Sequence, residues 1–315
     1  MSDPDVAVLR QTIHGADASE LAAAIRERLP DRSVALARTP AEERELLSTA
    51  RVAVGLHIDE SQLAAAENLE LFACVFAGTG HLPREALADR GVAVTNASGV
   101  HGPTIAEHVV GSMITHAHGW PQAQRQQARR EWRSYETREV YGSTVAVVGL
   151  GAIGSAVVDR LEPFGVETVG VRYSPEKGGP TDEVYGFDAF HEAIAEAEFV
   201  VLACPLTEAT RGLVDADALR TMRADAVLVN VARGAVVDTD ALVAALQKSR
   251  LGGAALDVTD PEPLPEDHPL WGLGNVTITP HNAGHTPEYY DRVADILAEN
   301  VDRLDADAEL RNRVE

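Results

Sequence analysis

Along the first hundred positions, apolar and polar residues follow two patterns that occur in turn. Short runs rich in Val, Leu and Ala are separated by stretches in which apolar residues recur at helical spacing. Such an alternation of strand and helix predicts a parallel sheet with helices on its faces. The strands are expected over 6–9, 33–37, 52–54, 71–76 and 92–95, and the helices over 18–28, 41–50, 60–67 and 84–89.

A longer apolar helix is expected over 104–118, just after Pro103. The strand and helix alternation then restarts at Ser143 and runs to residue 279, and a last amphipathic helix is expected over 287–304. The later strands are expected over 166–171, 199–203, 226–231, 253–257 and 276–279, with helices over 152–161, 189–198, 216–222 and 239–247.

The first strand after the restart breaks directly into a glycine-rich turn. Residues 143–154 read STVAVVGLGAIG, so an apolar strand meets the motif G-x-G-x-x-G at the start of a predicted helix. In this context Gly149 permits the tight turn, Gly151 lets a pyrophosphate approach, and Gly154 lets the helix pack on the strand. The predicted dinucleotide-binding turn comprises Gly149, Leu150, Gly151, Ala152, Ile153 and Gly154.

This turn lies in the middle of the chain, so the nucleotide-binding domain is predicted to be inserted into another domain. We expect the dinucleotide-binding domain over 98–284, and a smaller α/β substrate domain from 1–97 plus 285–315. The helices over 104–118 and 287–304 would cross between them, and the cleft between domains is the expected ligand site.

Composition adds a strong negative charge to this picture. The 315 residues include 49 acidic and 27 basic side chains, for a formal net charge of −22, and Lys177 and Lys248 are the two lysines. Such a surface repels nucleic acid and anionic membranes, so neither is an expected partner. Acid-rich, lysine-poor surfaces resemble those of haloarchaeal cytoplasmic proteins, and an acidic mesophile protein is the alternative.

The N-terminal ten residues, MSDPDVAVLR, contain neither a basic segment nor an apolar signal segment, so the protein is expected in the cytoplasm. Cys74 and Cys204 lie in apolar runs and are expected to be reduced core thiols. No metal site is expected, because His108 and His116, which could share one helix face, have no recognisable set of further ligands nearby.

Three segments after the glycine turn follow strand ends and carry polar chemistry. They are NVARG with Arg233, LDVTDPEPLP with Asp257 and Glu262, and TPHNAG with His281. In open α/β sheets, ligands bind at the carboxyl ends of strands. Arginine can hold a carboxylate with two hydrogen bonds and polarise a neighbouring carbonyl. Histidine can donate a proton as hydride arrives, and a glutamate beside it favours the charged imidazole. Together they suit the reduction of a 2-keto acid.

In this combination the chain resembles the D-isomer-specific 2-hydroxyacid dehydrogenases. The segments that carry the resemblance are GLGAIG (149–154), CPLTEATRGLVDADAL (204–219), NVARGAVVD (230–238), LDVTDPEPLP (256–265) and TPHNAG (279–284). The family implies a Rossmann domain inserted into a flavodoxin-like domain, an active site between them and a homodimer. It implies that Trp132 and Tyr135, within 128–141, belong to a segment that wraps the partner subunit; packing on the same chain is the alternative.

The resemblance also implies residue roles. Arg233 would bind and polarise the substrate, His281 would be the acid/base and Glu262 its partner, while Ala77 and Gly78 would hold the substrate carboxylate. Asp257 would bind the nicotinamide carboxamide. Two departures, Gly80 and Thr259, stand where many members carry Asp and an aromatic residue. Further dinucleotide contacts are expected from Thr104, Cys204, Pro205, Thr210, Val231, Ala232, Arg233, Asp257, His281, Ala283 and Gly284.

The end of the second nucleotide-domain strand indicates which dinucleotide binds. An NAD-preferring turn places an acid there for the ribose 2′-hydroxyl, but this strand ends in Arg172, Tyr173 and Ser174. An arginine in this place suits a 2′-phosphate, so NADP(H) is predicted as the preferred cofactor and NAD(H) as a weaker one. The alternative is that Arg172 stacks on the adenine, which would leave dual specificity.

Other functions stay open at this stage. Glyoxylate or hydroxypyruvate reductase differs from reductases of longer 2-keto acids in pocket shape alone. Phosphoglycerate dehydrogenase fits less well without an obvious regulatory extension, and formate dehydrogenases typically carry glutamine in place of Glu262. A different class is a dinucleotide-sensing protein on the same scaffold. The expected activity is the reversible reduction of 2-keto acids to D-2-hydroxy acids.

Overall fold

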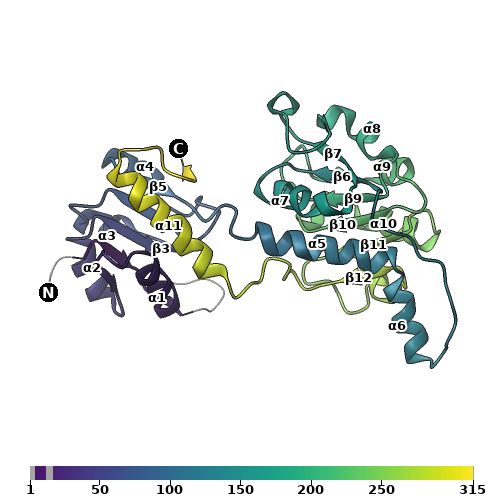
Figure 1. Cartoon of the computed structure of the whole chain (residues 1–315), viewed down its shortest axis with the longest axis horizontal. Coiled ribbons are helices and arrows are strands. Elements are labelled where there is room, and N and C mark those ends of the chain that lie inside the picture. Colours follow the sequence, from purple (N-terminus) through teal and green to yellow (C-terminus); the bar gives the residue numbers. More distant parts are fainter. Residues whose placement is uncertain (1–3, 12–16, 315) are drawn as a thin grey trace. The chain divides into compact units, whose positions relative to one another are not determined.

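The computed structural model describes residues 4–11 and 17–314, and the chain divides into two compact units. The first unit comprises residues 1–100 and 286–315, and the second comprises residues 101–285 (Figure 1). The unit boundaries therefore lie after residues 100 and 285. The sequence predicted them after residues 97 and 284.

The first unit is built on a twisted sheet with a flavodoxin-like strand order. Its order is β13-β5-β4-β3-β1-β2, in which β1 to β5 are parallel and β13 pairs with β5 in antiparallel fashion. The strands are β1 (Val6–Val8), β2 (Val34–Leu36), β3 (Val52–Gly55), β4 (Leu71–Cys74), β5 (Ala93–Thr95) and β13 (Arg313–Val314).

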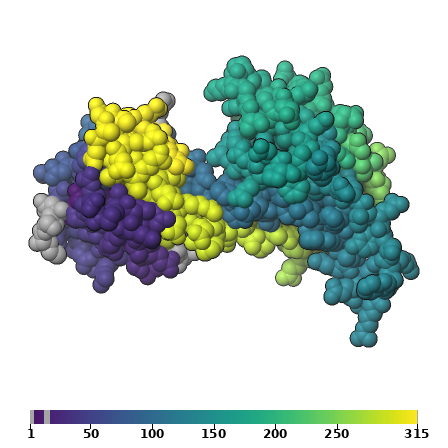
Figure 2. All heavy atoms as spheres, in the orientation of Figure 1, coloured from purple at the N-terminus to yellow at the C-terminus, as the bar shows by residue number. Residues whose placement is uncertain are grey.

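Helices cover both faces of this sheet, because successive strand residues point to opposite sides. On one face, Val8, Val54 and their neighbours pack against α1 (Ala18–Arg28) and α11 (Tyr289–Asp305), which lie side by side (Figure 2). On the other face, Phe72 and its neighbours pack against the remaining helices. These are α2 (Pro40–Leu47), α3 (Glu60–Ala65) and α4 (Arg84–Asp89).

The second unit contains a seven-stranded parallel sheet with the order β12-β11-β10-β9-β6-β7-β8. Counted from β6, this is the doubly wound order of a Rossmann domain, and the direction of winding reverses between β6 and β9. The strands are β6 (Thr144–Val148), β7 (Glu167–Val171), β8 (Glu183–Tyr185), β9 (Phe199–Leu202), β10 (Val227–Asn230), β11 (Gly253–Leu256) and β12 (Val276–Ile278).

Two layers of helices enclose the core of the second unit. Val147 and its neighbours on one face pack against α5 (Gly102–Ala117) and α7 (Ala152–Leu161). Val148 and its neighbours on the other face pack against three further helices. These are α8 (Phe190–Ala195), α9 (Ala216–Thr221) and α10 (Thr239–Gln247).

Three elements were not expected from the sequence: α6 (Trp120–Ala128), β8 and β13. Helix α6 has no buried residue, and after it the chain runs without regular structure to residue 139. Figure 2 shows this part of the second unit projecting from its surface. The side chain of Trp132 within it is fully exposed.

Cys74 and Cys204 are buried free thiols, as predicted. Among the helices of the described ranges, none is both long enough and apolar enough to cross a membrane.

Candidate functional site

The glycine turn between β6 and α7 has the geometry of a phosphate-binding turn. Gly149 has φ of +98°, and a Cβ on it would lie 2.7 Å from the backbone nitrogen of Cys204. A Cβ on Gly154 would lie 1.9 Å from the carbonyl oxygen of Gly149. Gly151 faces open space and its φ is −86°. The fold itself therefore requires glycine at 149 and 154, whereas Gly151 leaves room beside the turn.

The residues of this turn fit a dinucleotide pyrophosphate. Helix α7 starts at Ala152, and no side chain in the described part of the chain caps its first turn. Its free N–H groups and the positive end of its dipole therefore face the open side of Gly151. The second unit has two cavities of similar size, of about 570 Å³ and about 530 Å³. The cavity of about 530 Å³ lies at the glycine turn. It is lined by Gly149, Leu150, Gly151, Arg172, Tyr173, Ser174, Phe187, Cys204, Pro205, Thr207, Glu208, Ala209 and Thr210.

The lining of this cavity brings together three predicted segments that are far apart in sequence. Arg172 follows β7, and its Nη1 donates a hydrogen bond of 2.5 Å to the carbonyl oxygen of Gly178. This bond holds the guanidinium beside the loop that contains Tyr173, whose side chain is 81% exposed. Glu208 also lines the cavity and was not expected from the sequence. The cavity thus has a cation, an exposed aromatic ring and one acidic side chain among its lining residues.

Cys204 and Thr210 line the same cavity, and the Thr210 hydroxyl is committed to the fold. The Thr210 hydroxyl donates to the Pro205 carbonyl at 2.6 Å and accepts the Thr207 N–H at 2.8 Å. It therefore closes the loop over 205–210. Burial raises the pKa of the Cys204 thiol to about 11, so the thiol stays neutral at physiological pH.

Arg233 lies just past the carboxyl end of β10, and its side chain is exposed. Its Nη1 donates to the carbonyl oxygen of Ala232 at 2.6 Å. Within residues 4–11 and 17–314, no carboxylate forms an ion pair with Arg233. In a chain with such an excess of acidic residues, this leaves the guanidinium available for an anion.

His281 and Glu262 form a direct pair. His281 Nδ1 lies 2.7 Å from Glu262 Oε1, and the side chains are 47% and 39% exposed, respectively. His281 has φ of +54°, and its N–H donates to the carbonyl oxygens of Asp257 at 2.8 Å and Thr279 at 3.0 Å. The backbone thus holds the imidazole beside the carboxylate, with Nε2 left for a reacting atom.

Asp257 ties the histidine loop to the end of β11. Its side chain is 3% exposed. Oδ1 accepts the Thr279 hydroxyl at 2.6 Å and the Asn282 N–H at 3.0 Å, and Oδ2 accepts the Ala283 N–H at 3.0 Å. A carboxylate has about four acceptor positions, so one remains on Oδ2.

The start of α5 lies against the end of this loop. The Thr104 hydroxyl donates to the His285 carbonyl at 3.4 Å, and His101 Nδ1 is hydrogen-bonded to the Gly284 carbonyl at 2.9 Å. A Cβ on Gly102 would lie 3.3 Å from the carbonyl oxygen of Ala152, at the first turn of α7. Thr104 and Gly284 are therefore held close to the start of α7, as part of one packed region. Val231 and Ala232 are buried just after β10.

Ala77 and Gly78 lie in the first unit, in the loop that follows β4. Both residues are exposed, and the Ala77 carbonyl accepts a hydrogen bond of 2.7 Å from Asn96 Nδ2. Neither Gly78 nor Gly80 has a positive φ, so backbone conformation does not explain glycine at these positions.

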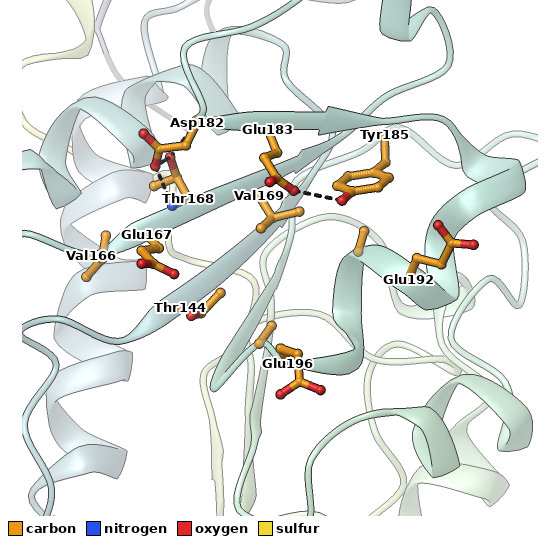
Figure 3. A pocket seen from close by; sticks show the side chains of 12 residues that line it. Thr144, Val166, Glu167, Thr168, Val169, Asp182, Glu183, Tyr185, Glu192 and Glu196 are labelled. Atoms are coloured by element: carbon orange, nitrogen blue, oxygen red, sulfur yellow. Dashed lines mark hydrogen bonds between the residues drawn. The ribbon is translucent and has the colours of Figure 1, made fainter.

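The other cavity, of 570 Å³, contains none of the predicted site residues. Figure 3 shows it at the β7–β8 edge of the sheet, where five carboxylates gather around Thr144 and Val169. Asp182 accepts two hydrogen bonds from Thr168, which lower the pKa of its carboxyl group. Glu183 accepts the Tyr185 hydroxyl at 2.7 Å. In the described part of the chain, no cluster of three or more His, Cys, Asp or Glu side chains could hold a metal ion.

A Rossmann sheet with an open glycine turn, a cavity beside it and a histidine–glutamate pair past two neighbouring strands is the framework of a dinucleotide-dependent oxidoreductase. Residues 110–283 match the family described as D-isomer specific 2-hydroxyacid dehydrogenase, NAD binding domain. The chain belongs to this family.

Relatives and solved structures agree with this assignment. The chain is 35% identical over 254 residues to glyoxylate reductase/hydroxypyruvate reductase of Homo sapiens, covering 78% of this chain and 77% of that protein. It is 33% identical over 286 residues to D-3-phosphoglycerate dehydrogenase of Methanocaldococcus jannaschii, covering 89% of this chain but 54% of that protein. The D-isomer specific 2-hydroxyacid dehydrogenase from Xanthobacter autotrophicus Py2, solved in complex with NADPH and MES, superposes with a TM-score of 0.77. It is 29% identical and the match covers 99% of this chain and 98% of that one.

Proposed function

We propose that the protein reversibly reduces 2-keto acids to D-2-hydroxy acids with NADPH as the preferred reductant. The observation that carries this proposal is the pairing of His281 with Glu262 at 2.7 Å, together with Arg233 after the neighbouring strand β10, which forms no ion pair with a carboxylate of the described residues. Other arginines, such as Arg26 and Arg250, also form no ion pair with a carboxylate of the described residues, so it is the place of Arg233 that supports its role. Arg233 follows β10, and the backbone of the glycine after it packs against the segment that leads to Glu262. A guanidinium there fits a substrate that brings its own carboxylate.

Each residue has a defined part in this reaction. The bound nicotinamide supplies the hydride that arrives at carbon 2 of the substrate. The guanidinium of Arg233 binds the substrate carboxylate and polarises the carbonyl. His281 donates the proton to the carbonyl oxygen from Nε2, while Glu262 stabilises the charged imidazole through Nδ1. Ala77 and Gly78 are proposed to offer backbone N–H groups to the carboxylate.

Two further groups are proposed to hold the dinucleotide. The remaining acceptor position on Asp257 Oδ2 suits the amide of the nicotinamide. The guanidinium of Arg172 suits a 2′-phosphate, because it lines the cavity beside the glycine turn and is steadied by Gly178. The carboxylate of Glu208 lines the same cavity and repels a phosphate nearby. We therefore propose that the protein prefers NADP(H) but also uses NAD(H).

The first experiment is steady-state reduction of a panel of 2-keto acids, from glyoxylate to branched-chain acids, with NADPH and with NADH. Expected are turnover with NADPH and formation of the D-isomer. Because the net charge is −22, we also propose a halophilic protein, whose activity rises from low to molar KCl as salt screens the acidic surface. Tight dinucleotide binding without turnover of any acid in either salt would instead indicate a sensor.

The cofactor preference has its own test. In Arg172→Ala, kcat/KM with NADPH should fall at least about tenfold, the effect of losing one charge-assisted hydrogen bond of about 1.5–3 kcal/mol. The value with NADH should change less than about twofold. Arg211→Ala is the control substitution. Arg211 directly follows Thr210, a residue that lines this cavity. A wild-type preference for NADH that is unchanged in Arg172→Ala would refute the proposed preference for NADPH.

Glyoxylate/hydroxypyruvate reduction is a second candidate. It is favoured by the human relative with that name, of which the match covers 77%. The same acid panel decides, because a small pocket would give glyoxylate and hydroxypyruvate a higher kcat/KM than branched-chain acids.

We also propose that the protein forms a homodimer through the segment 129–139. This segment lacks regular structure and exposes Trp132 fully, with Arg129, Arg130 and Arg133 exposed beside three exposed glutamates. Arg138 instead packs on its own chain, over the Phe199 ring and 3.6 Å from Asp225. A fully exposed tryptophan on a segment that projects from the unit suits an aromatic anchor buried against a second copy. Light scattering after size exclusion should give the dimer mass for wild type and a smaller mass for Trp132→Ala; a monomeric wild type would refute the proposal.

A further inference from the structure

Asn230 is a buried polar residue that the proposed chemistry does not use. It is the last residue of β10, is 1% exposed and precedes Arg233 by three positions. Its Oδ1 accepts the Ala232 N–H at 3.0 Å, and its Nδ2 donates to the Arg233 carbonyl at 3.1 Å. A buried amide is costly unless both its donor and its acceptor are satisfied. Here both are satisfied by the short turn that leads to Arg233.

The same turn is held from its other side by close backbone packing. A Cβ on Gly234 would lie 2.0 Å from the carbonyl carbon of Thr259, in the segment that leads to Glu262. The Arg233 carbonyl also accepts the Val236 N–H at 3.2 Å, at a 3₁₀ turn over Gly234–Val236. The backbone of Arg233 is thus fixed between this packing and the side chain of Asn230.

We propose that Asn230 is a positioning residue for Arg233, whose backbone it fixes so that the guanidinium meets the substrate carboxylate. The inference rests on the proposed role of Arg233. The Arg233 side chain is exposed, its Nη1 bonds to the adjacent Ala232 carbonyl, and no carboxylate of the described residues directs it, so its reach is set by where the backbone lies. In an active site, a displacement of about 1 Å can cost about a hundredfold in rate.

The chemistry of the amide makes this role specific. Asparagine offers an acceptor to the Ala232 N–H and a donor to the Arg233 carbonyl, which also accepts the Val236 N–H, so one side chain links both residues of the turn. Asn230→Asp has nearly the same shape and keeps the acceptor. It replaces the donor by an oxygen that faces the Arg233 carbonyl. Asn230→Ser is a second, uncharged variant whose short hydroxyl can accept the Ala232 N–H but cannot span to Arg233.

The chain offers a matched control in its other unit. Asn300 is 0% exposed, its Nδ2 donates to the Arg311 carbonyl at 3.0 Å and its Oδ1 accepts the Arg311 N–H at 2.7 Å. Asn300→Asp and Asn300→Ser therefore remove the same kind of buried hydrogen bond, far along the chain from Arg233. They should lower Tm as the Asn230 variants do and leave the kinetic constants within about twofold.

The readouts separate positioning from general stability. In Asn230→Asp and Asn230→Ser, kcat/KM for the 2-keto acid and affinity for oxamate, a non-reacting analogue, should fall about tenfold or more. The Kd of the dinucleotide should change several-fold less than the affinity for oxamate, although the turn over 231–233 is also expected to contact the dinucleotide. In an Arg233→Ala background, the same Asn230 substitutions should cost little further, because the group being positioned is gone.

The outcomes also distinguish the two proposals. Full activity in Arg233→Ala would refute the role of Arg233, and the role of Asn230 with it. Loss of activity in Arg233→Ala, together with unchanged oxamate affinity in folded Asn230→Ser, would refute the positioning role alone. Equal kinetic losses in the Asn230 variants with and without Arg233 would refute it as well.

Discussion

Glu262→Gln is the substitution that most directly tests how the histidine works. Glutamine keeps the shape of the side chain and can still accept a hydrogen bond from Nδ1, but it lacks the charge. A charge-assisted hydrogen bond contributes about 1.5–3 kcal/mol and a neutral one about 0.5–1.5 kcal/mol. Because Glu262 and His281 are 39% and 47% exposed, solvent screens the pair and the smaller difference applies. A loss of about 1 to 1.4 kcal/mol lowers kcat/KM for reduction about fivefold to tenfold.

The assay is kcat/KM for 2-keto acid reduction at one fixed pH near neutrality. Reduction needs a proton donated by His281, so a loss of the partner charge should appear as a lower kcat/KM in Glu262→Gln. Glu266→Gln, an exposed carboxylate in the same loop, is the control and should match wild type. A kcat/KM for Glu262→Gln within twofold of wild type would refute the reasoning, as would an equal loss in Glu266→Gln.

Two further predictions concern the glycine turn and acid stability. Gly154→Ala should fail to fold or lose much of its stability, because its Cβ would lie 1.9 Å from a backbone oxygen. Gly151→Ala should keep the wild-type Tm and lose dinucleotide affinity, because Gly151 faces open space. Equal Tm values for the two variants would contradict this prediction. Burial and the nearby charge of Arg138 lower the pKa of His116 to about 4, so the unfolded chain, with an ordinary value of 6.5, binds this proton first as pH falls. The free energy of unfolding should therefore drop between about pH 6.5 and pH 4, by up to about 3 kcal/mol from this residue. Urea unfolding of His116→Gln should show a shallower drop than wild type, and parallel curves would contradict the assignment.

The strands and helices that were predicted correctly have strong periodic patterns and buried faces. Helix α6 was not predicted, because it buries no residue and so has no apolar face that a sequence pattern could reveal. Strand β8 is three residues at a sheet edge, and β13 is two residues that pair with β5 far away in sequence. Their pairing depends on tertiary contacts rather than on local preference.

The candidate site was predictable to the extent that motifs follow strand ends. The glycine turn and the Glu262–His281 pair could be expected, because parallel strands deliver their carboxyl ends to one edge of a sheet. The supporting contacts of Asn230 and Asp257 could not, since a single polar residue at a strand end does not reveal its partners. A buried asparagine directly before an arginine-bearing turn is a signal that could have drawn attention to it.

The placement of Arg233, Glu262 and His281 in one unit, between residues 101 and 285, has a consequence for how the protein could change over time. The groups proposed for proton transfer and for holding the dinucleotide are carried by one continuous stretch of chain. The part proposed for the first unit is recognition of the substrate through the loop at Ala77 and Gly78. New substrates could then be acquired by altering residues before position 100, while the inherited hydride chemistry stays untouched. A chimera that joins this second unit to the first unit of a relative should keep the cofactor preference and take on the relative's choice of acid.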